Sequence, residues 1–255
     1  MSYCSPTGVS NSMKLNEGGN IFKDADKNPL TQRINRADVE PTVRWLEQLT
    51  GLSLVDNMLG TTGRKETSGD LDLAVDVNKI DKDTLVQVLL KKGVDKADIK
   101  KSGDSVHHKT PINGDPANGY VQTDFMFGEP KWQHFSMQGG AENSEYKGMH
   151  RQILLSSIAK AMGYKWSYKN GLMDRESNTT LDGGKNPAVI SKTLGIPIAK
   201  LNSVEDIIDS IKGRPDYQQL VADAREALAR DNLTLPESAG DHAPIGTAAW
   251  FRKFV

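Results

Sequence analysis

The chain has 255 residues, of which 37% are hydrophobic and 25% are charged, an ordinary balance for a folded protein with a buried core. A formal net charge of −1 gives no strong overall positive field, so composition alone neither predicts nor excludes a nucleic-acid partner. The single cysteine, Cys4, excludes a disulfide framework within one chain and argues against a cysteine-based metal site. No apolar leader and no apolar run of about 18 residues occur, so we expect a cytoplasmic protein without a membrane partner.

The N-terminal part of the chain divides into an arm, a helix and a loop. Residues 1–30 are rich in small and polar residues without periodicity, and we expect a flexible arm with one ordered turn near Ile21. A helix is predicted over residues 36–51, because apolar residues recur at spacings of three and four and Gly51 is a natural stop. Residues 60–69 then read as a loop of small and polar side chains.

Two segments have the alternating pattern of β-strands. Aliphatic residues and carboxylates alternate over residues 70–77, which predicts a strand with carboxylates on one face and aliphatic side chains on the other. An amphipathic helix is expected over residues 81–93. Residues 120–127 alternate again and predict another strand.

Helical patterns dominate the rest of the chain. Helices are predicted at about 148–163, 187–195, 203–212 and 216–230. The expected fold is therefore α/β (α+β), with a small mixed sheet and flanking helices followed by a mostly helical C-terminal region. We expect a catalytic core over residues 31–135 and a C-terminal domain over residues 136–255.

Three aspartates are the candidate metal ligands. Asp70 and Asp72 leave the same face of a strand about 6–7 Å apart, a spacing that allows both to share divalent ions lying about 3.5–4 Å from one another. Asp124 lies on the other predicted strand and reaches the same point if the two strands pair. Such hard oxygen ligands suit magnesium. An Asp-x-Asp pair by itself is more often a solvated outer face of a sheet.

The loop before the first strand favours the metal-site interpretation over the solvated face. It contains two glycines and two threonines, Gly60-Thr61-Thr62-Gly63, followed by Arg64 and Lys65. Backbone N–H groups in such a loop can bind phosphate, and nearby cations add positive charge. Exposed charges that contact no ligand are an equal alternative for Arg64 and Lys65. The spacing is not that of a Walker A loop.

These motifs together resemble the signature of the DNA polymerase β nucleotidyltransferase superfamily. The residues that carry the resemblance are Gly60-Thr61, Gly69-Asp70-Leu71-Asp72 and Asp124, and the stretches Gly63–Asp72 and Val121–Asp124 are especially similar to family X DNA polymerases. Weaker similarity continues through residues 146–171 and 190–197. Thr61 stands where that family usually has serine, and it keeps the hydroxyl group.

The resemblance implies an enzyme that moves a nucleoside monophosphate from an NTP or dNTP to an acceptor hydroxyl and releases pyrophosphate. It implies that Asp70 and Asp72 bind two Mg²⁺ or Mn²⁺ ions and that Asp124 completes one site and helps to activate the hydroxyl. The residues that it assigns to nucleotide binding are Gly60, Thr61, Thr62, Gly63, Arg64, Lys65, Gly69, Lys147 and Arg151. Ordinary helix-surface charge is the alternative for Lys147 and Arg151.

The acceptor and the activity itself have alternatives. The loop is a residue shorter than in typical family X polymerases, and the lyase and DNA-gripping domains of those enzymes have no counterpart here, which argues against processive polymerisation. The acceptor can be a nucleic-acid end, a protein side chain or a small molecule. The basic stretch from Lys100 to Lys109 could contact acceptor phosphates or be a solvated loop. The competing functions are a catalytically inactive binding or assembly module and a hydrolase that uses the same acidic cluster.

Overall fold

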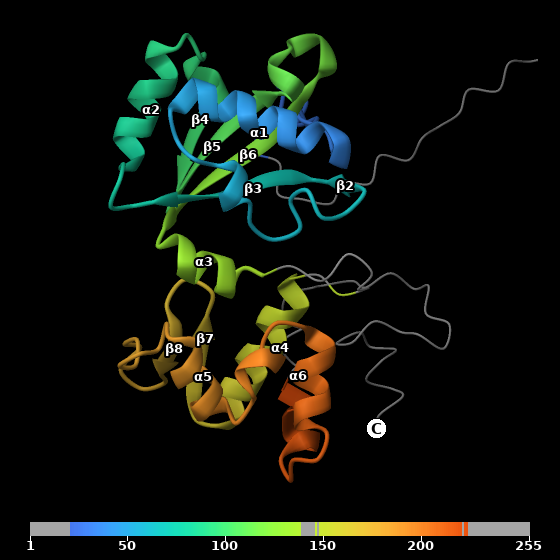
Figure 1. The fold of residues 1–255 in the computed structure, drawn as a ribbon, viewed down its shortest axis with the longest axis vertical. Helices are drawn as coiled ribbons and strands as arrows, with labels where there is room; N and C mark the ends of the chain where they lie inside the picture. Colours follow the sequence, from blue (N-terminus) through green and yellow to red (C-terminus); the bar gives the residue numbers. More distant parts are fainter. Residues whose placement is uncertain (1–20, 139–145, 147, 221, 224–255) are drawn as a thin grey trace, which may run out of the picture.

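The protein is described by a computed structural model over residues 21–138, 146, 148–220 and 222–223. Its upper half in Figure 1 contains a β-sheet with helices α1 and α2, and its lower half contains helices α4, α5 and α6 with a β-hairpin. Helix α3 lies between the two halves (Figure 1). The predicted α+β class, with a small mixed sheet followed by a mostly helical region, is confirmed.

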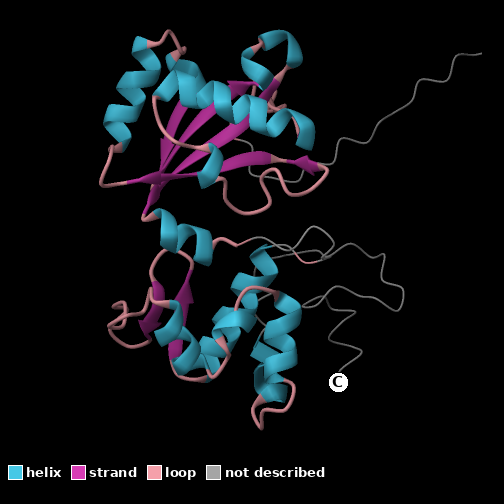
Figure 2. Ribbon diagram, viewed as in Figure 1, coloured by secondary structure: helices cyan, strands magenta, loops and turns pink. Residues whose placement is uncertain are grey.

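The main sheet has four strands in the order β3-β6-β5-β4 (Figure 2). Strands β3 and β6 are parallel, whereas β5 is antiparallel to both of its neighbours, β6 and β4. Two further antiparallel pairs, β1–β2 and β7–β8, stand apart from this sheet. The strand bounds are β1 Ile34–Asn35, β2 Thr67–Ser68, β3 Asp70–Asp76, β4 Ile99–Ser102, β5 Ser105–Pro111, β6 Tyr120–Gly128, β7 Tyr164–Ser167 and β8 Gly171–Asp174.

Five of the six α-helices lie close to the positions that the periodicity predicts, whereas α3 was not predicted. The α-helix bounds are α1 Arg36–Thr50, α2 Lys82–Lys91, α3 Pro130–Ser136, α4 Gly148–Ala161, α5 Pro187–Leu194 and α6 Val204–Ile211. Short 3-10 helices occupy Val55–Asn57, Lys96–Asp98, Ile112–Gly114, Pro116–Asn118 and Ile198–Lys200. Helix α1 ends at Gly51, whose left-handed φ of 75° suits glycine. The helix predicted over residues 216–230 lies mostly outside the described residues.

One face of the sheet forms the first hydrophobic core. Leu71, Leu73 and Val75 of β3 point to this face and pack with residues of α1 and α2. The intervening residues Asp70 and Asp72 therefore lie on the opposite face, as period-two alternation requires. Burial of the aliphatic side chains thus fixes the direction in which both carboxylates point.

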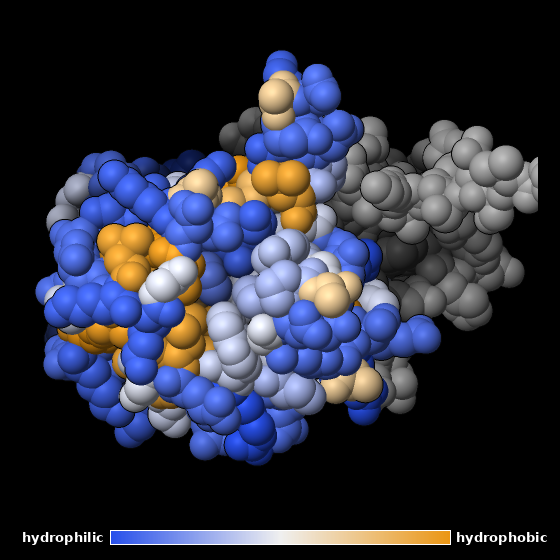
Figure 3. Space-filling view, turned by 90° about the horizontal axis from the view of Figure 1, so that it is seen from above, coloured by the Kyte–Doolittle hydropathy of each residue, from blue (hydrophilic) through white to orange (hydrophobic). Residues whose placement is uncertain are grey.

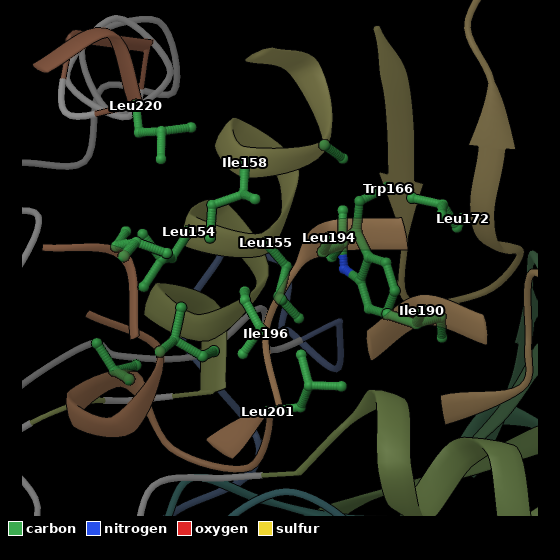
Figure 4. Close-up of a cluster of buried hydrophobic side chains, with 14 of the residues drawn as sticks. Leu154, Leu155, Ile158, Trp166, Leu172, Ile190, Leu194, Ile196, Leu201 and Leu220 are labelled. Atoms are coloured by element: carbon green, nitrogen blue, oxygen red, sulfur yellow. The ribbon is translucent and has the colours of Figure 1, made fainter. Parts of the chain in front are cut away.

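Helices α4 to α6 and the β7–β8 hairpin enclose a second core (Figure 4). Leu154, Leu155 and Ile158 of α4 form its centre, and Trp166 of β7 closes one side. Trp132 of α3 belongs to this second core. The chain therefore passes from the first core to the second by Trp132, a few residues before the predicted boundary at 135. The division into separate domains stays a prediction.

The β4–β5 hairpin is the main element that the sequence analysis did not predict. For the basic stretch from Lys100 to Lys109 a solvated loop was one of two alternatives, and the structure instead places these residues in β4, β5 and the turn between them. In β5 the face toward the helices carries Val106, His108 and Thr110, and two of these three are polar. Thr110 Oγ1 contacts His108 Nδ1 at 2.8 Å and donates to Thr123 Oγ1 at 2.7 Å, and hydrogen bonding makes such burial tolerable.

Residues 21–30 belong to the predicted arm, in which one ordered turn was expected near Ile21. They form a turn in which Leu30 N donates to Phe22 O at 2.9 Å and Lys23 pairs with Pro29. Phe22 is only 2% exposed, and the ammonium group of Lys100 lies 5.1 Å from its ring centroid. The start of the described arm, at Ile21 and Phe22, is thus packed onto the sheet, whereas residues 23–30 are exposed.

The surface seen from above carries mostly hydrophilic residues, with hydrophobic residues in separate patches (Figure 3). None of the helices in the described ranges is long and apolar enough to cross a membrane.

The buried imidazole of His108 predicts a dependence of stability on pH. Burial, with a smaller contribution from Lys109, lowers the pKa of His108 to about 4. The unfolded chain protonates this imidazole near its ordinary pKa of 6.5. The folded state is therefore at no disadvantage above that pH, and it loses stability relative to the unfolded state as the pH falls from 6.5 toward 4. Between pH 7 and pH 5 we expect a loss of about 2 kcal/mol in the free energy of unfolding.

Chemical denaturation at the two pH values measures this loss, and His108→Gln is the control because glutamine does not titrate. Between pH 7 and pH 5, His108→Gln should lose about 2 kcal/mol less of its free energy of unfolding than the wild-type protein. An equal loss in both proteins would contradict a neutral, buried His108.

Candidate metal centre

The parallel pairing of β3 and β6 brings the three predicted metal ligands together. Asp72 and Asp124 are direct register partners, and Asp70 pairs with Gln122 two residues earlier on β6. One carboxylate oxygen from each of Asp70, Asp72 and Asp124 lies within 4.8 Å of the others. Because these side chains leave the face opposite the aliphatic core, their convergence is a direct result of register.

Mutual repulsion and burial make the ionised cluster unfavourable without a cation. Burial raises the pKa of Asp72 well above its ordinary value, and the negative charges of Asp70 and Asp124 raise it further. Burial and Asp124 also raise the pKa of Asp70, whereas Arg33 lowers it. Three converging carboxylates are a suitable donor set for a hard divalent cation, which replaces this repulsion with attraction. The residues present therefore fit Mg²⁺ or Mn²⁺.

The predicted phosphate loop lies directly beside Asp72. Leu59 N donates to Asp72 O at 2.8 Å, and Asp72 N donates to Thr62 Oγ1 at 3.1 Å. Gly60 has a φ of 59°, and a Cβ atom there would lie 3.4 Å from a carboxylate oxygen of Asp72. Glycine therefore lets the loop backbone approach the carboxylate while it turns in the left-handed region.

Asp124 is held by two hydrogen bonds to one of its oxygens. Nδ1 of His107 lies 2.7 Å from Asp124 Oδ1, and Gln122 Nε2 donates to the same oxygen at 3.0 Å. His107 is the register partner of Asp124 on β5, whereas Gln122 lies two residues before Asp124 on β6. The sequence analysis did not connect either residue with Asp124. For Gln122 the i, i+2 spacing on one strand was the available signal, whereas His107 required knowledge of β5.

A cavity of about 460 Å³ opens from the carboxylates toward the second core. One side holds Asp70, Asp72 and the loop residues, together with the cations Arg33 and Lys65. Met149 and Gln152 of α4 and Tyr168 of the β7–β8 turn are on the other side. Both halves of the molecule therefore form the cavity. Ligand pockets frequently lie at such an interface between two parts of a protein.

The turn that carries Tyr168 is anchored to α3 and to the sheet half. Trp132 Nε1 donates to the carbonyl oxygen of Tyr168 at 2.9 Å. Lys169 forms an ion pair with Asp104, which lies in the β4–β5 turn. Tyr168 remains 50% exposed, so its ring is available at the cavity wall.

Four of the nine predicted nucleotide-binding residues line the cavity. The residues that line the cavity are Gly60, Thr61, Lys65 and Gly69. Thr62 is buried and Gly63 packs against Val39, so both support the loop from behind. Arg64 is exposed and does not line the cavity. Lys147 lies outside the described residues.

The structure places Arg151 in the core rather than at the cavity. Its side chain is 2% exposed, Nε donates to Leu201 O at 2.8 Å, and Nη1 donates to Ser136 O at 3.0 Å. Burial lowers the pKa of Arg151 to about 10. Its guanidinium group thus links α4 to the end of α3 and to the segment around Leu201. This buried position does not agree with the predicted contact between Arg151 and a nucleotide. Helical periodicity alone cannot tell a buried arginine from an exposed one.

Comparison with known proteins adds no family assignment. The chain matches no protein-family model, and no curated protein matches it. The candidate site therefore depends on its residues and their geometry.

The repulsion at Asp72 predicts a stabilising substitution. A carboxyl group whose pKa is raised by folding favours the folded state only while it is protonated, so ionised Asp72 destabilises the metal-free protein at neutral pH. In EDTA at pH 7.5, Asp72→Asn should raise the melting temperature by about 2–4 °C or more, the change that 1 kcal/mol produces in a chain of this size. Mg²⁺ should stabilise the wild-type protein and not this variant.

Asp76→Asn is the matched control, because Asp76 is on the same strand but outside the carboxylate cluster. Scanning calorimetry with and without Mg²⁺ provides the comparison. A lower melting temperature of Asp72→Asn in EDTA would show that the ionised carboxylate stabilises the fold, contrary to this interpretation.

Proposed function

We propose that the protein is a metal-dependent nucleotidyltransferase that moves a nucleoside monophosphate from a nucleoside triphosphate to an acceptor hydroxyl. The observation that carries this proposal is the convergence of three carboxylates, two of which, Asp70 and Asp72, line a cavity, while Asp124 lies close behind them. The same cavity is lined by the glycine-threonine loop and by two cations, Arg33 and Lys65. Carboxylates, phosphate-binding groups and a nucleotide-sized space then occur together. The resemblance of the same motifs to the polymerase β superfamily supports the same chemistry.

The carboxylates would hold two divalent ions at the reacting phosphate. Asp70 and Asp72 would contribute to both ions and Asp124 to one. When bound, the ions supply positive charge that stabilises the phosphoryl group under attack and lowers the pKa of the attacking hydroxyl. The resemblance to the polymerase β superfamily implies that Asp124 would also help to activate or orient this hydroxyl.

The loop and the cations would bind the phosphates that leave as pyrophosphate. Gly60 and Thr61 line the cavity beside Asp72, where backbone N–H groups and a hydroxyl can donate to phosphate oxygens. Lys65 and Arg33 line the same region and would add positive charge. The sequence analysis did not include Arg33, which lies in the segment before β1.

The opposite side of the cavity would bind the nucleoside. Tyr168 presents an exposed aromatic ring there, and Met149 and Met137 add flexible apolar surface. Base stacking on an aromatic ring tolerates any base. We therefore infer that this wall binds the base without fixing its identity.

Retention of all three carboxylates in one cluster favours an enzyme over an inactive assembly module. The competing hydrolase would use the same cluster with water as the acceptor. The three classes of acceptor stay alternatives, and the cytoplasmic location stays a prediction.

A transfer assay tests the proposal. Purified protein with Mg²⁺ or Mn²⁺ and each α-³²P-labelled nucleoside triphosphate is incubated with DNA, tRNA, total RNA or extract protein. We expect label on one class of acceptor and a loss of at least about a hundredfold in Asp70→Asn and Asp72→Asn. Each variant removes a carboxylate ligand of the cations whose positive charge would stabilise the transition state.

Asp76→Asn should transfer label at the wild-type rate. Release of labelled nucleoside monophosphate without any labelled acceptor would instead indicate the hydrolase. If no label is transferred or released, and metal and nucleotide binding are also absent by calorimetry, the enzyme interpretation is wrong and the binding module replaces it.

A further inference from the structure

A chain of hydrogen bonds leads from the N-terminal segment to the third carboxylate. The backbone N–H of Ile21 donates to Gln122 Oε1 at 3.0 Å, and Gln122 Nε2 donates to Asp124 Oδ1 at 3.0 Å. Gln122 is 3% exposed, so both ends of its amide group are used inside the protein. The N–H of Ile21 thereby fixes which end of the amide is the oxygen and which end donates to Asp124.

Ile21 is held on the same face of the sheet as the carboxylates. Lys100 Nζ donates to Ile21 O at 2.6 Å, and Lys100 is the register partner of His107, which is the partner of Asp124. Cross-strand partners share a face, so Lys100, His107 and Asp124 all lie on the carboxylate face. Because Ile21 contacts β4 and β6, which flank β5, this segment crosses β5.

Both donors to Asp124 select the same oxygen. His107 Nδ1 and Gln122 Nε2 each bond to Oδ1. Among the described residues, none donates a hydrogen bond to Oδ2. Two donors from different strands thus fix the rotation of the carboxylate and leave its second oxygen without a protein donor in this part of the chain.

We propose that His107 and Gln122, with Gln122 itself oriented by Ile21 N–H, are positioning residues that aim Asp124 Oδ2 at a bound divalent cation. This inference depends on the proposed function, because it assumes that the carboxylate cluster binds metal. The N-terminal segment then has a defined task, since it sets the amide orientation of Gln122. Partners that orient metal ligands typically affect metal affinity or activity by about 10–100-fold.

The imidazole provides a matched pair of substitutions. The side-chain nitrogen of asparagine can occupy the place of His107 Nδ1 and donate to Asp124, whereas leucine has no donor. Binding of Mn²⁺ alone, followed by electron paramagnetic resonance of the free ion, measures metal affinity without any turnover. We expect His107→Leu to raise the Mn²⁺ dissociation constant about tenfold and His107→Asn to remain within about twofold of wild type.

The backbone donor provides a second, independent pair. Ile21→Pro removes the N–H that orients Gln122, whereas Ile21→Ala keeps it. Ile21→Pro should raise the Mn²⁺ dissociation constant about threefold or more, and Ile21→Ala should not change it. Full-length protein is used throughout, and circular dichroism melting verifies that each variant is folded at the temperature of the titration.

The outcomes separate this inference from the proposed function. Wild-type protein that binds no Mn²⁺ would overturn the proposed function and the inference with it. If the wild type binds Mn²⁺ and folded His107→Leu and Ile21→Pro bind it equally well, the positioning inference is wrong while the metal site remains. A weakened His107→Leu that His107→Asn does not restore would also overturn the inference, because any role of His107 would then be packing alone.

Discussion

The register of β3 against β6 is the constraint on which the candidate site depends. Parallel pairing sets Asp72 opposite Asp124 and Asp70 opposite Gln122. A shift by one residue would turn one set of side chains to the other face and separate the carboxylates. Burial of Leu71 and Leu73 in the core of the sheet half prevents such a shift, because it would bring the carboxylates into an apolar environment.

This register concentrates unfavourable burial and repulsion of charge at the three carboxylates. The raised pKa values of Asp70 and Asp72 are the result of burial and of proximity to other carboxylates. Perturbed acidic groups beside a cavity are typical of functional sites. The rest of the fold tolerates them because the two hydrophobic cores lie elsewhere, and the second core supplies the opposite wall of the cavity.

Much of the local structure could be predicted from sequence periodicity. Helix α1 with its stop at Gly51, and the strands β3 and β6, follow from the spacing of apolar residues. Asp70 and Asp72 could be nominated because an i, i+2 pair must share a face of its strand, and Asp124 because it lies on a second predicted strand. That they meet was a hypothesis until pairing was known, since register between distant strands is a tertiary property.

The features that could not be predicted involve buried polar residues. Strand β5 places His108 and Thr110 in the core, so it lacks the apolar alternation that marks a strand. His107 therefore had no assigned neighbour, and its contact with Asp124 could not be inferred. Arg151 shows the converse, because a charged residue on a predicted helix lies inside the second core and bonds to backbone carbonyl groups.

Asp70, Asp72 and Asp124 are proposed to bind divalent metal together, beside a nucleotide. A crystal of the protein with Mn²⁺ and a non-hydrolysable nucleoside triphosphate tests it directly through the anomalous signal of manganese. We expect anomalous peaks within about 2.0–2.3 Å of oxygens from all three aspartates, with the triphosphate toward Gly60 and Lys65. Manganese bound elsewhere, or a nucleotide in the cavity without metal at the carboxylates, would contradict the account.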